Sequence, residues 1–300
     1  MQPKVELAKS RDFGEIINDT FNFIKQNMKQ LVKNQFIFCG LFFLAGSLLF
    51  VLQQYRAKNL ITSMGEMGPQ TYESINTFRL LGVSYFIGIA LVFIGGCISV
   101  ITVLSYMAIY KQKGNIVPET SEVWGYIKYY FLRSLLVVFV VAILFGLGLV
   151  LCLIPGIYLF PIMGLICPVM IFENGSFEYS FSRAFQLIKD NWWVTAATVL
   201  VSWIIYYFMA MIVTIPISIV GIGSSLLSPV KSFTVMPLWA SVVSVFIQQI
   251  TMLFSIIPVI TIALCYFNLS ESKEGTSLLD RINKLGNNNT PQTDLPTEEY

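Results

Sequence analysis

Residues 134–172 read SLLVVFVVAILFGLGLVLCLIPGIYLFPIMGLICPVMIF and contain no charged side chain. A helix of about 20 apolar residues crosses the roughly 30 Å hydrocarbon layer of a bilayer, so this run is long enough for two crossings. Pro155 and Gly156 interrupt it, and proline begins helices well but continues them poorly. We therefore predict two spanning helices, 134–153 and 156–172, joined by a tight turn.

Four further stretches lack charged residues and are long enough to cross a bilayer: 34–55, 80–110, 191–230 and 232–270. The last two have no comparable break at their centres, so we predict one helix in each, at 192–216 and 238–267. Pro258 is expected to kink the final helix. After Pro216 we predict an apolar outer loop, and membrane-embedded structure over 210–235 is the open alternative. The prediction is thus six transmembrane helices.

Composition supports this fold class. Hydrophobic residues make up 55% of the chain and charged residues 12%, whereas a soluble domain has roughly 25% charged residues. We predict an all-α integral membrane domain over 1–269. A cytoplasmic tail over 270–300 follows, with a short amphipathic helix and then a disordered segment rich in Asn, Pro, Thr and Glu.

The positions of Lys and Arg predict the orientation. With six spans, fifteen basic residues fall on the side of the termini and four on the opposite side. Because cytoplasmic loops are enriched in basic residues, both termini are expected in the cytoplasm. The expected location is the bacterial cytoplasmic (inner) membrane, as a multi-pass protein. The formal net charge of +2 gives no indication of a nucleic-acid partner.

Three segments that precede predicted spans share a pattern of apolar residues at helical spacing, each followed directly by a lysine. Side chains at these offsets share one face of a helix, and such a helix next to a span is typical of one lying in the headgroup plane. The residues are Phe13, Ile17, Phe21 and Ile24, then Ile116, Thr120, Trp124 and Ile127, then Phe177, Phe181, Phe185 and Ile188.

The pattern predicts a three-unit internal repeat over 12–110, 116–173 and 176–268. Each unit would be a cytoplasmic-side interfacial helix followed by a two-span hairpin, and parallel repeats of this kind occur in membrane folds. The alternative is that any amphipathic helix leading into a span shows such a stripe. Asp12 with Glu15 and Ser176 are predicted helix caps. Trp192 and Trp193 are placed at the membrane boundary, where aromatic residues concentrate.

The sequence contains no histidine. Imidazole is therefore excluded as a general base and as a metal ligand. No Asp or Glu lies within a predicted span, which removes the acid pair of an intramembrane aspartyl protease and argues against proton-coupled transport. We predict that the chain is not an enzyme, and we assign no catalytic, cofactor-binding or metal-binding residue.

Three polar residues near or within spans are candidate functional or packing residues. Glu173 ends the fourth span within reach of Arg183 or Lys189. It either contacts a headgroup or a partner, or marks the water boundary at a helix end. Gln248 and Gln249 lie inside the last span, and at least one should face other helices, because an unpaired amide in hydrocarbon is costly. Substrate contact is the alternative for this pair.

Three prolines, Pro155, Pro161 and Pro168, lie in the predicted fourth span, 156–172, or at its start. They are expected to bend it. A broken helix near the middle of a bilayer can line a cavity, although proline is also common in spans without such a role.

The stretch Ile154-Pro155-Gly156-Ile157-Tyr158, then Pro168, Glu173 and the segment 180–193 (SFSRAFQLIKDNWW), carries a resemblance. The sequence resembles a family of uncharacterised bacterial six-helix membrane proteins allied to the membrane domain of glycerophosphoryl diester phosphodiesterases. Its opening, residues 11–17 (RDFGEII), looks like the Bacteroidetes-type branch. The resemblance implies the six-helix fold and no particular activity. Similar proteins have been labelled carotene-cleaving oxygenases, but those enzymes hold iron through histidines, which are absent here.

The expected function is that of a non-enzymatic membrane protein that organises lipids or a membrane partner complex. A transporter or lipid-moving permease is the alternative. The expected partners are membrane lipids and a membrane or cytoplasmic protein. The oligomeric state is left open.

Overall fold

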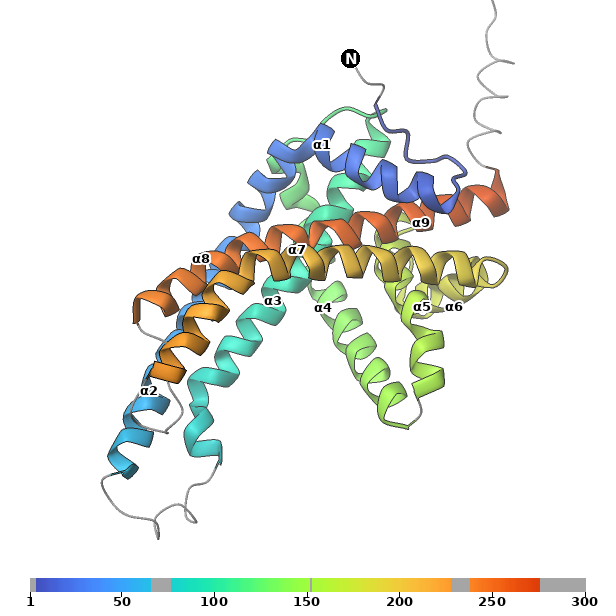
Figure 1. Ribbon diagram of the computed structural model, residues 1–300. Coiled ribbons are helices and arrows are strands. Elements are labelled where there is room, and N and C mark those ends of the chain that lie inside the picture. Colours follow the sequence, from blue (N-terminus) through green and yellow to red (C-terminus); the bar gives the residue numbers. More distant parts are fainter. Residues whose placement is uncertain (1–3, 66–76, 152, 228–237, 276–300) are drawn as a thin grey trace, which may run out of the picture.

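The computed structural model describes residues 4–65, 77–151, 153–227 and 238–275 (Figure 1). Over these residues it contains helices and no strands. The helices are α1 (Phe13–Phe38), α2 (Gly40–Gly65), α3 (Thr77–Gln112), α4 (Thr120–Leu151), α5 (Leu153–Phe172), α6 (Phe177–Ile188), α7 (Trp192–Leu227), α8 (Leu238–Phe254) and α9 (Ile256–Glu274). The predicted tail structure over 276–300 lies outside the described residues.

Several helices have the length and composition of membrane spans. Four segments qualify alone: Gly82–Gln112, Thr120–Gly148, Trp192–Val220 and Trp239–Glu274, the last comprising α8 and α9. A fifth is available if α1 and α2, which are bent by 55°, form one broken span. The apolar part of α5, Gly156–Phe172, is shorter. The chain is thus all-helical over the described residues, with four or five helices of membrane-spanning length.

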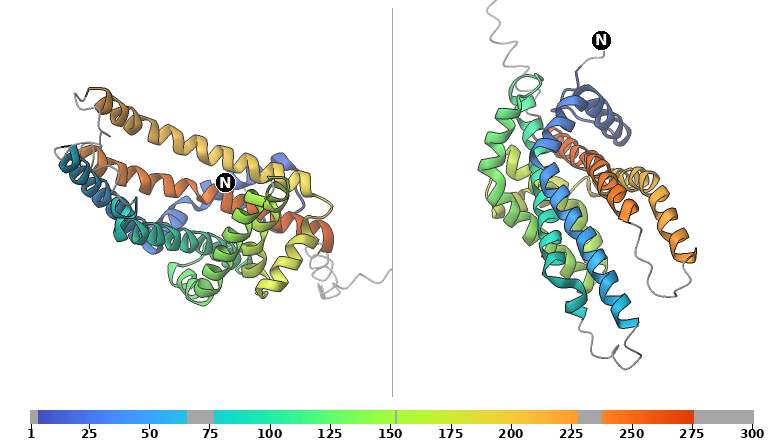
Figure 2. Two further views of the ribbon diagram at one scale, coloured as in Figure 1. Left: turned by 90° about the horizontal axis from the view of Figure 1, so that it is seen from below. Right: turned by 90° about the vertical axis from the view of Figure 1, so that its left-hand side faces the viewer.

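The buried centre of the bundle is formed by α3 and α9. In the most apolar window of each span, 61% of α8–α9 and 50% of α3 is buried, against 11% of α4 and 6% of α7. The helix α9 contacts α1, α3, α5, α6 and α7. Figure 2 shows α7 along one edge of the molecule. The helices α4 and α7 therefore present most of their surface outward, where a bilayer would contact them.

The first helix is longer than predicted. We predicted that the interfacial helix gives way to the first span at residue 34, and this boundary was wrong. The helix α1 continues to Phe38, and the bend falls at Cys39. The physical reason lies in the last turns of α1, where the polar side chains of Asn34 and Gln35 are fully buried. Asn34 bonds to Thr120 on α4 and Gln35 bonds to Ser99 on α3. These bonds hold the last turns of α1 against the bundle, so the helix continues past residue 34.

The middle segment does not form a separate interfacial helix, which corrects the prediction. Thr120 begins α4, and α4 runs unbroken to Leu151. Gly40 follows the first segment and Asp190-Asn191 follows the third, but between Ile127 and Ser134 there is no glycine, proline or asparagine. Without a residue that ends a helix, the amphipathic start and the apolar run stay in one helix.

The predicted break in the apolar run at 134–172 is confirmed. The helix α4 ends at Leu151 and α5 begins at Leu153, and the two helices form a hairpin (Figure 1). Pro155 falls in the first turn of α5, where the missing backbone amide costs no hydrogen bond. The chain therefore reverses direction between α4 and α5, before Pro155.

The prediction that the fifth span ends at Pro216 was wrong. The helix α7 continues through Pro216 to Leu227, so at least the first part of the predicted outer loop is helical. One proline removes a single backbone hydrogen bond, and the following residues Ile217, Ile219 and Val220 remain apolar and favour an ordered helix. Residues 228–237 lie outside the described residues.

The predicted kink at Pro258 is confirmed as a break between helices. The helix α8 ends at Phe254 and α9 begins at Ile256. A proline ring clashes with the carbonyl four residues earlier, and for Pro258 that carbonyl belongs to Phe254, the last residue of α8.

Candidate functional site

The helix α1 has three distinct faces. One face is buried against the protein and contains Ile16, Thr20, Phe23, Asn27 and Leu31. The predicted apolar stripe lies beside it: Phe13 and Phe21 are each 40% exposed, and Ile17 and Ile24 are half-buried. The third face carries the exposed lysines Lys25, Lys29 and Lys33.

The buried face of α1 is polar as well as apolar, and sequence reasoning missed it. The Tyr106 hydroxyl donates to Asn27 Oδ1 at 2.8 Å, and Gln35 Nε2 donates to Ser99 Oγ at 2.9 Å. These bonds fix α1 to α3. The available signal was the spacing of Thr20, Asn27 and Asn34 at intervals of seven residues, which places them on one helical face.

A groove of about 760 Å³ lies where α1, α2 and the start of α4 meet. The Trp124 ring stacks on Phe38 with centroids 5.4 Å apart and planes 5° apart. The Lys128 ammonium lies 5.1 Å from the centre of the Trp124 ring. The residues lining the groove are mainly apolar, namely Ile37, Phe38, Leu41, Phe42, Ile98, Trp124, Ile127 and Phe131, with Thr120, Ser121 and Lys128.

Glu173 lies at the junction of α5, α6 and α9. Its carboxylate accepts hydrogen bonds from the Tyr179 hydroxyl at 2.6 Å and the Tyr266 hydroxyl at 2.9 Å. The Arg183 guanidinium lies 3.3 Å from it, as expected for one of its two predicted partners. Arg183 also pairs with Glu274 near the end of α9. In this arrangement Glu173 binds groups of its own chain.

The apolar stripe of α6 faces the protein. Phe177, Phe181 and Phe185 pack against the core cluster, and Ile188 is 1% exposed. The Ser176 hydroxyl accepts from the Tyr179 amide at 3.3 Å, which confirms the predicted cap. This stripe therefore differs from that of α1, where two phenylalanines remain exposed.

The two tryptophans that begin α7 point to different surroundings. The Trp192 indole donates to the Tyr158 carbonyl at 3.1 Å and stacks on its ring, so it joins α7 to α5. Trp193 is 81% exposed.

The glutamine pair is also divided. Gln248 is exposed, whereas Gln249 is 6% exposed. Neither amide atom of Gln249 has a hydrogen-bond partner among the described residues. One amide of the pair, that of Gln249, thus faces the inside of the protein as predicted, but it makes no hydrogen bond to the described residues.

A second, apolar cavity of about 430 Å³ lies between α3, α5, α7 and α9. Of the predicted site residues in the described part of the chain, Pro168 lines it, whereas Pro161 is buried elsewhere in α5. Pro168 lacks an amide, so the carbonyl of Gly164 loses its usual intrahelical donor. Gly164 and Pro258 line the same cavity. Proline positions in α5 and α9, where a backbone hydrogen bond is missing, therefore border the same cavity.

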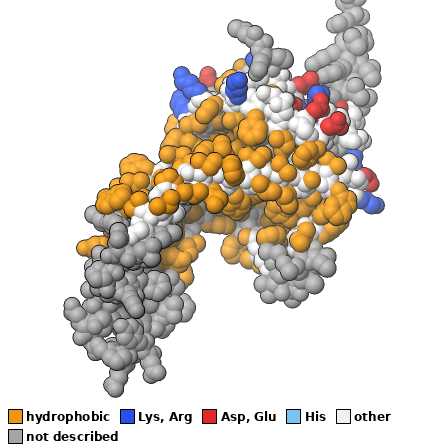
Figure 3. All heavy atoms as spheres, in the orientation of Figure 1, with side chains coloured by type: hydrophobic (Ala, Val, Ile, Leu, Met, Phe, Trp, Pro, Cys, Tyr) orange, Lys and Arg blue, Asp and Glu red, His pale blue; other side chains and the backbone are white. Residues whose placement is uncertain are grey.

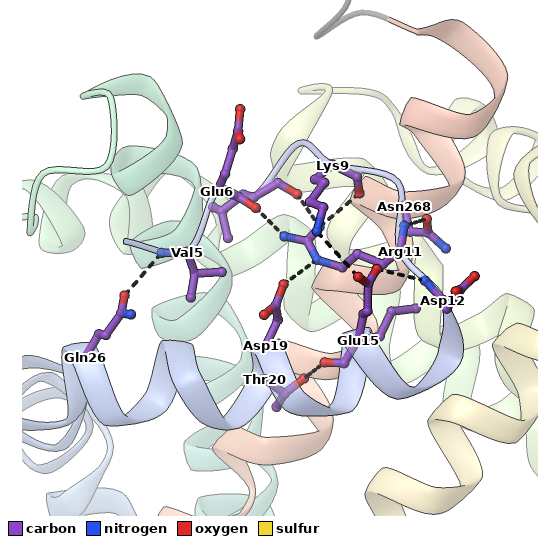
Figure 4. A network of polar contacts seen from close by, with 12 residues as sticks. Val5, Glu6, Lys9, Arg11, Asp12, Glu15, Asp19, Thr20, Gln26 and Asn268 are labelled. Atoms are coloured by element: carbon purple, nitrogen blue, oxygen red, sulfur yellow. Dashed lines mark hydrogen bonds and ion pairs between the residues drawn. The ribbon is translucent and has the colours of Figure 1, made fainter. Parts of the chain in front are cut away.

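The N-terminal segment folds over α1 around a buried arginine (Figure 4). The Arg11 side chain is fully buried and pairs with Asp19 at 2.8 Å. Its guanidinium also donates to the carbonyls of Leu7 at 2.8 Å and Lys9 at 3.0 Å. The Arg11 amide donates to Asn268 Oδ1 at 2.7 Å, which connects this segment to α9. The sequence analysis used Arg11 only as part of a motif.

The predicted cap of α1 is present, because the Asp12 amide donates to the Glu15 carboxylate at 3.2 Å.

Among the described residues, no three Cys, Asp or Glu side chains are grouped so that they could hold a metal ion. No family model, curated protein or solved structure matches the chain.

Proposed function

We propose that the chain is a non-enzymatic, six-span membrane protein that organises lipids along its cytoplasmic side, with both termini in the cytoplasm of a bacterium. The observation that carries this proposal is the division of α1 into three faces. One face binds the bundle, the next exposes Phe13 and Phe21, and the third exposes lysines. A helix with an apolar stripe beside a basic stripe is suited to the headgroup boundary of an anionic membrane.

The distribution of charge supports this orientation. In Figure 3 the charged side chains gather along the upper and right-hand edges, next to a broad hydrophobic surface. Four spans qualify alone, and the bent pair α1–α2 supplies one more, which is α2 when α1 lies at the interface. Six spans result if α5 also crosses despite its shorter length. The interfacial helix and the six-span topology belong together, because only six spans return α1 and α6 to the same side.

The depth of α1 can be tested by spin labels in protein reconstituted into lipid nanodiscs. A label at Phe21→Cys should collide with oxygen, which partitions into lipid, more than with a water-soluble nickel complex. A label at Lys29→Cys, on the lysine face about 80° around the helix from Phe21, should show the reverse. Equal access of the nickel complex to both labels would contradict an interfacial α1. Mass spectrometry of the same nanodiscs would show whether lipids or a stoichiometric protein partner copurify.

A second candidate function is movement of a lipid or another apolar molecule through the bundle. It is favoured by the 430 Å³ cavity and by the helix interruptions that border it. Gly96 lines this cavity, and a Cβ atom there would contact nothing within 4 Å. Gly96→Phe should therefore fill the cavity and abolish transbilayer movement of fluorescent phospholipid in proteoliposomes. Movement that is absent from the wild type, or unchanged by this substitution, would exclude the second candidate.

A further inference from the structure

We infer that the groove between α1, α2 and α4 binds one anionic phospholipid of the cytoplasmic leaflet, an inference that rests on the proposed orientation. At about 760 Å³, its volume lies within the range of roughly 300–1,000 Å³ found for ligand pockets. An apolar groove facing a bilayer would be filled by an acyl chain, and the charges at its mouth decide which headgroup is preferred.

The groove has the depth of one leaflet. Its lining on α4 runs from Thr120 to Phe131, a length of about 16 Å at 1.5 Å per residue. Half of a hydrocarbon layer is about 15 Å thick. The polar residues Thr120 and Ser121 lie at the end of α4 nearest the charged segments, and the aromatic and aliphatic residues lie beyond them. Polarity thus changes along the groove as it does along a phospholipid.

The mouth of the groove is basic. Lys128 lines the groove two turns beyond Thr120, and its ammonium reaches back over the Trp124 ring, one turn nearer the polar end. It makes no ion pair in the described part of the chain. Lys33 lies one helical turn before the groove residue Ile37, so the two side chains share a face of α1. One nearby carboxylate, Glu119, accepts a hydrogen bond from Ser121 at 3.5 Å. Two lysines against one carboxylate leave a net positive mouth.

Glu122 does not neutralise this mouth. Its carboxylate lies 2.5 Å from the Lys113 ammonium, and both residues line a separate pocket.

A buried amide provides a further donor. The Thr120 hydroxyl accepts from Gln30 Nε2 at 3.1 Å, so its own proton goes to Asn34 Oδ1 at 3.0 Å. This assignment leaves Asn34 Nδ2, beside Thr120, without a partner among the described residues, although Asn34 is fully buried. An unpaired buried donor is costly.

Native mass spectrometry of the full chain, released from nanodiscs, tests the assignment. With equal amounts of phosphatidylglycerol and phosphatidylcholine of the same acyl chains, one phosphatidylglycerol should remain bound per chain. Lys128→Gln and Lys33→Gln should each weaken its retention about fivefold, the effect expected for one basic residue near an anionic surface. Lys25→Gln, on the same helix but two turns before Lys33, is the matched control and should retain the lipid.

Equal retention of the two lipids, or equal loss in the control variant, would overturn the inference. Glycerol phosphate in millimolar excess distinguishes a lipid from a free phosphate: if it displaces the signal completely, the groove holds a headgroup alone and the acyl-chain assignment is wrong. The spin-label result for α1 is independent of Lys128. An interfacial α1 without selective retention would therefore reject the groove assignment and leave the proposed function standing.

Discussion

The Tyr266 hydroxyl on α9 lies 2.9 Å from Oε1 of Glu173, the residue that follows the last turn of α5. The same oxygen lies 3.3 Å from Arg183 Nε on α6. A negative charge at a helix C-terminus is unfavourable for the helix dipole, and hydrogen-bond donors from two other helices compensate it. Glu173 thus joins α5 and α6, which are neighbours in the sequence, to α9, where Tyr266 is 93 residues further along the chain.

Replacing Glu173 by Gln should destabilise this junction. The amide keeps the shape of the side chain but loses the charge that attracts Arg183 and the acceptor strength offered to Tyr179. Hydrogen bonds to charged groups contribute about 1.5–3 kcal/mol, so the free energy of unfolding should fall by about 2 kcal/mol. Thermal unfolding of the purified protein in detergent measures it as a lower Tm. Tyr266→Phe, which removes one donor only, should cost less, and an unchanged Tm for Glu173→Gln would contradict the role.

The ion pair between Asp190 and Lys273, 2.9 Å apart, predicts an acid-dependent contribution. A hydrogen bond from Lys273 lowers the pKa of Asp190 from its usual value of 3.8. A lowered folded-state pKa means that the contribution is present above 3.8 and is lost as the pH falls through the lower value. The Tm of Asp190→Asn should therefore lie below that of the wild type at neutral pH and match it in strong acid. A difference in Tm that persists at low pH would show that Asp190 does not contribute through its ion pair with Lys273.

Arg11 is expected to hold the N-terminal segment in place. Its guanidinium is fully buried and binds Asp19 and the carbonyls of Leu7 and Lys9. Lysine at this position could not reach several acceptors at once, because it lacks the planar fork. Arg11→Lys should therefore cost about 2 kcal/mol and expose the segment before α1 to protease. Lys9→Arg, at a largely exposed position, is the control. Equal protease resistance in both variants would refute the assignment.

Two glycines in the same helix pair should respond in opposite ways to alanine. At Gly46 a Cβ atom would lie 2.7 Å from Val92 Cγ2 and 3.2 Å from the Gly88 carbonyl oxygen, so α2 and α3 would have to separate. At Gly96 a Cβ would meet nothing within 4 Å. Alanine favours a helix over glycine by about 1 kcal/mol. Gly96→Ala should thus raise the Tm slightly and Gly46→Ala should lower it, and a rise in both would indicate that the helices do not pack closely at Gly46.

Several features of the fold could be predicted because they depend on short-range properties. The break between α4 and α5 and the break between α8 and α9 follow from the geometry of proline. The caps at Asp12 and Ser176 follow from side chains that reach an amide two or three residues away. The α6 helix was also expected from its apolar spacing.

The faces that those helices present could not be predicted. The same spacing of apolar residues leaves Phe13 and Phe21 exposed on α1 and packs Phe181 and Phe185 against the core on α6. Periodicity identifies a stripe, but burial depends on which neighbour covers it, and that neighbour is distant in the sequence. For α1 the polar residues Asn27 and Asn34 turn an adjacent face inward, because their hydrogen-bond partners lie on α3 and α4.

The run at 134–172 shows the division most clearly. Its lack of charge, its length and Pro155 were sufficient to determine two apolar helices with a break between them. Only the tertiary structure decided that Pro168 and Gly164 border a cavity shared with α3, α7 and α9, and that Glu173 receives its donors from α6 and α9. Local chain geometry is set by neighbouring residues, whereas a cavity or a shared carboxylate requires helices that meet only after the chain has folded.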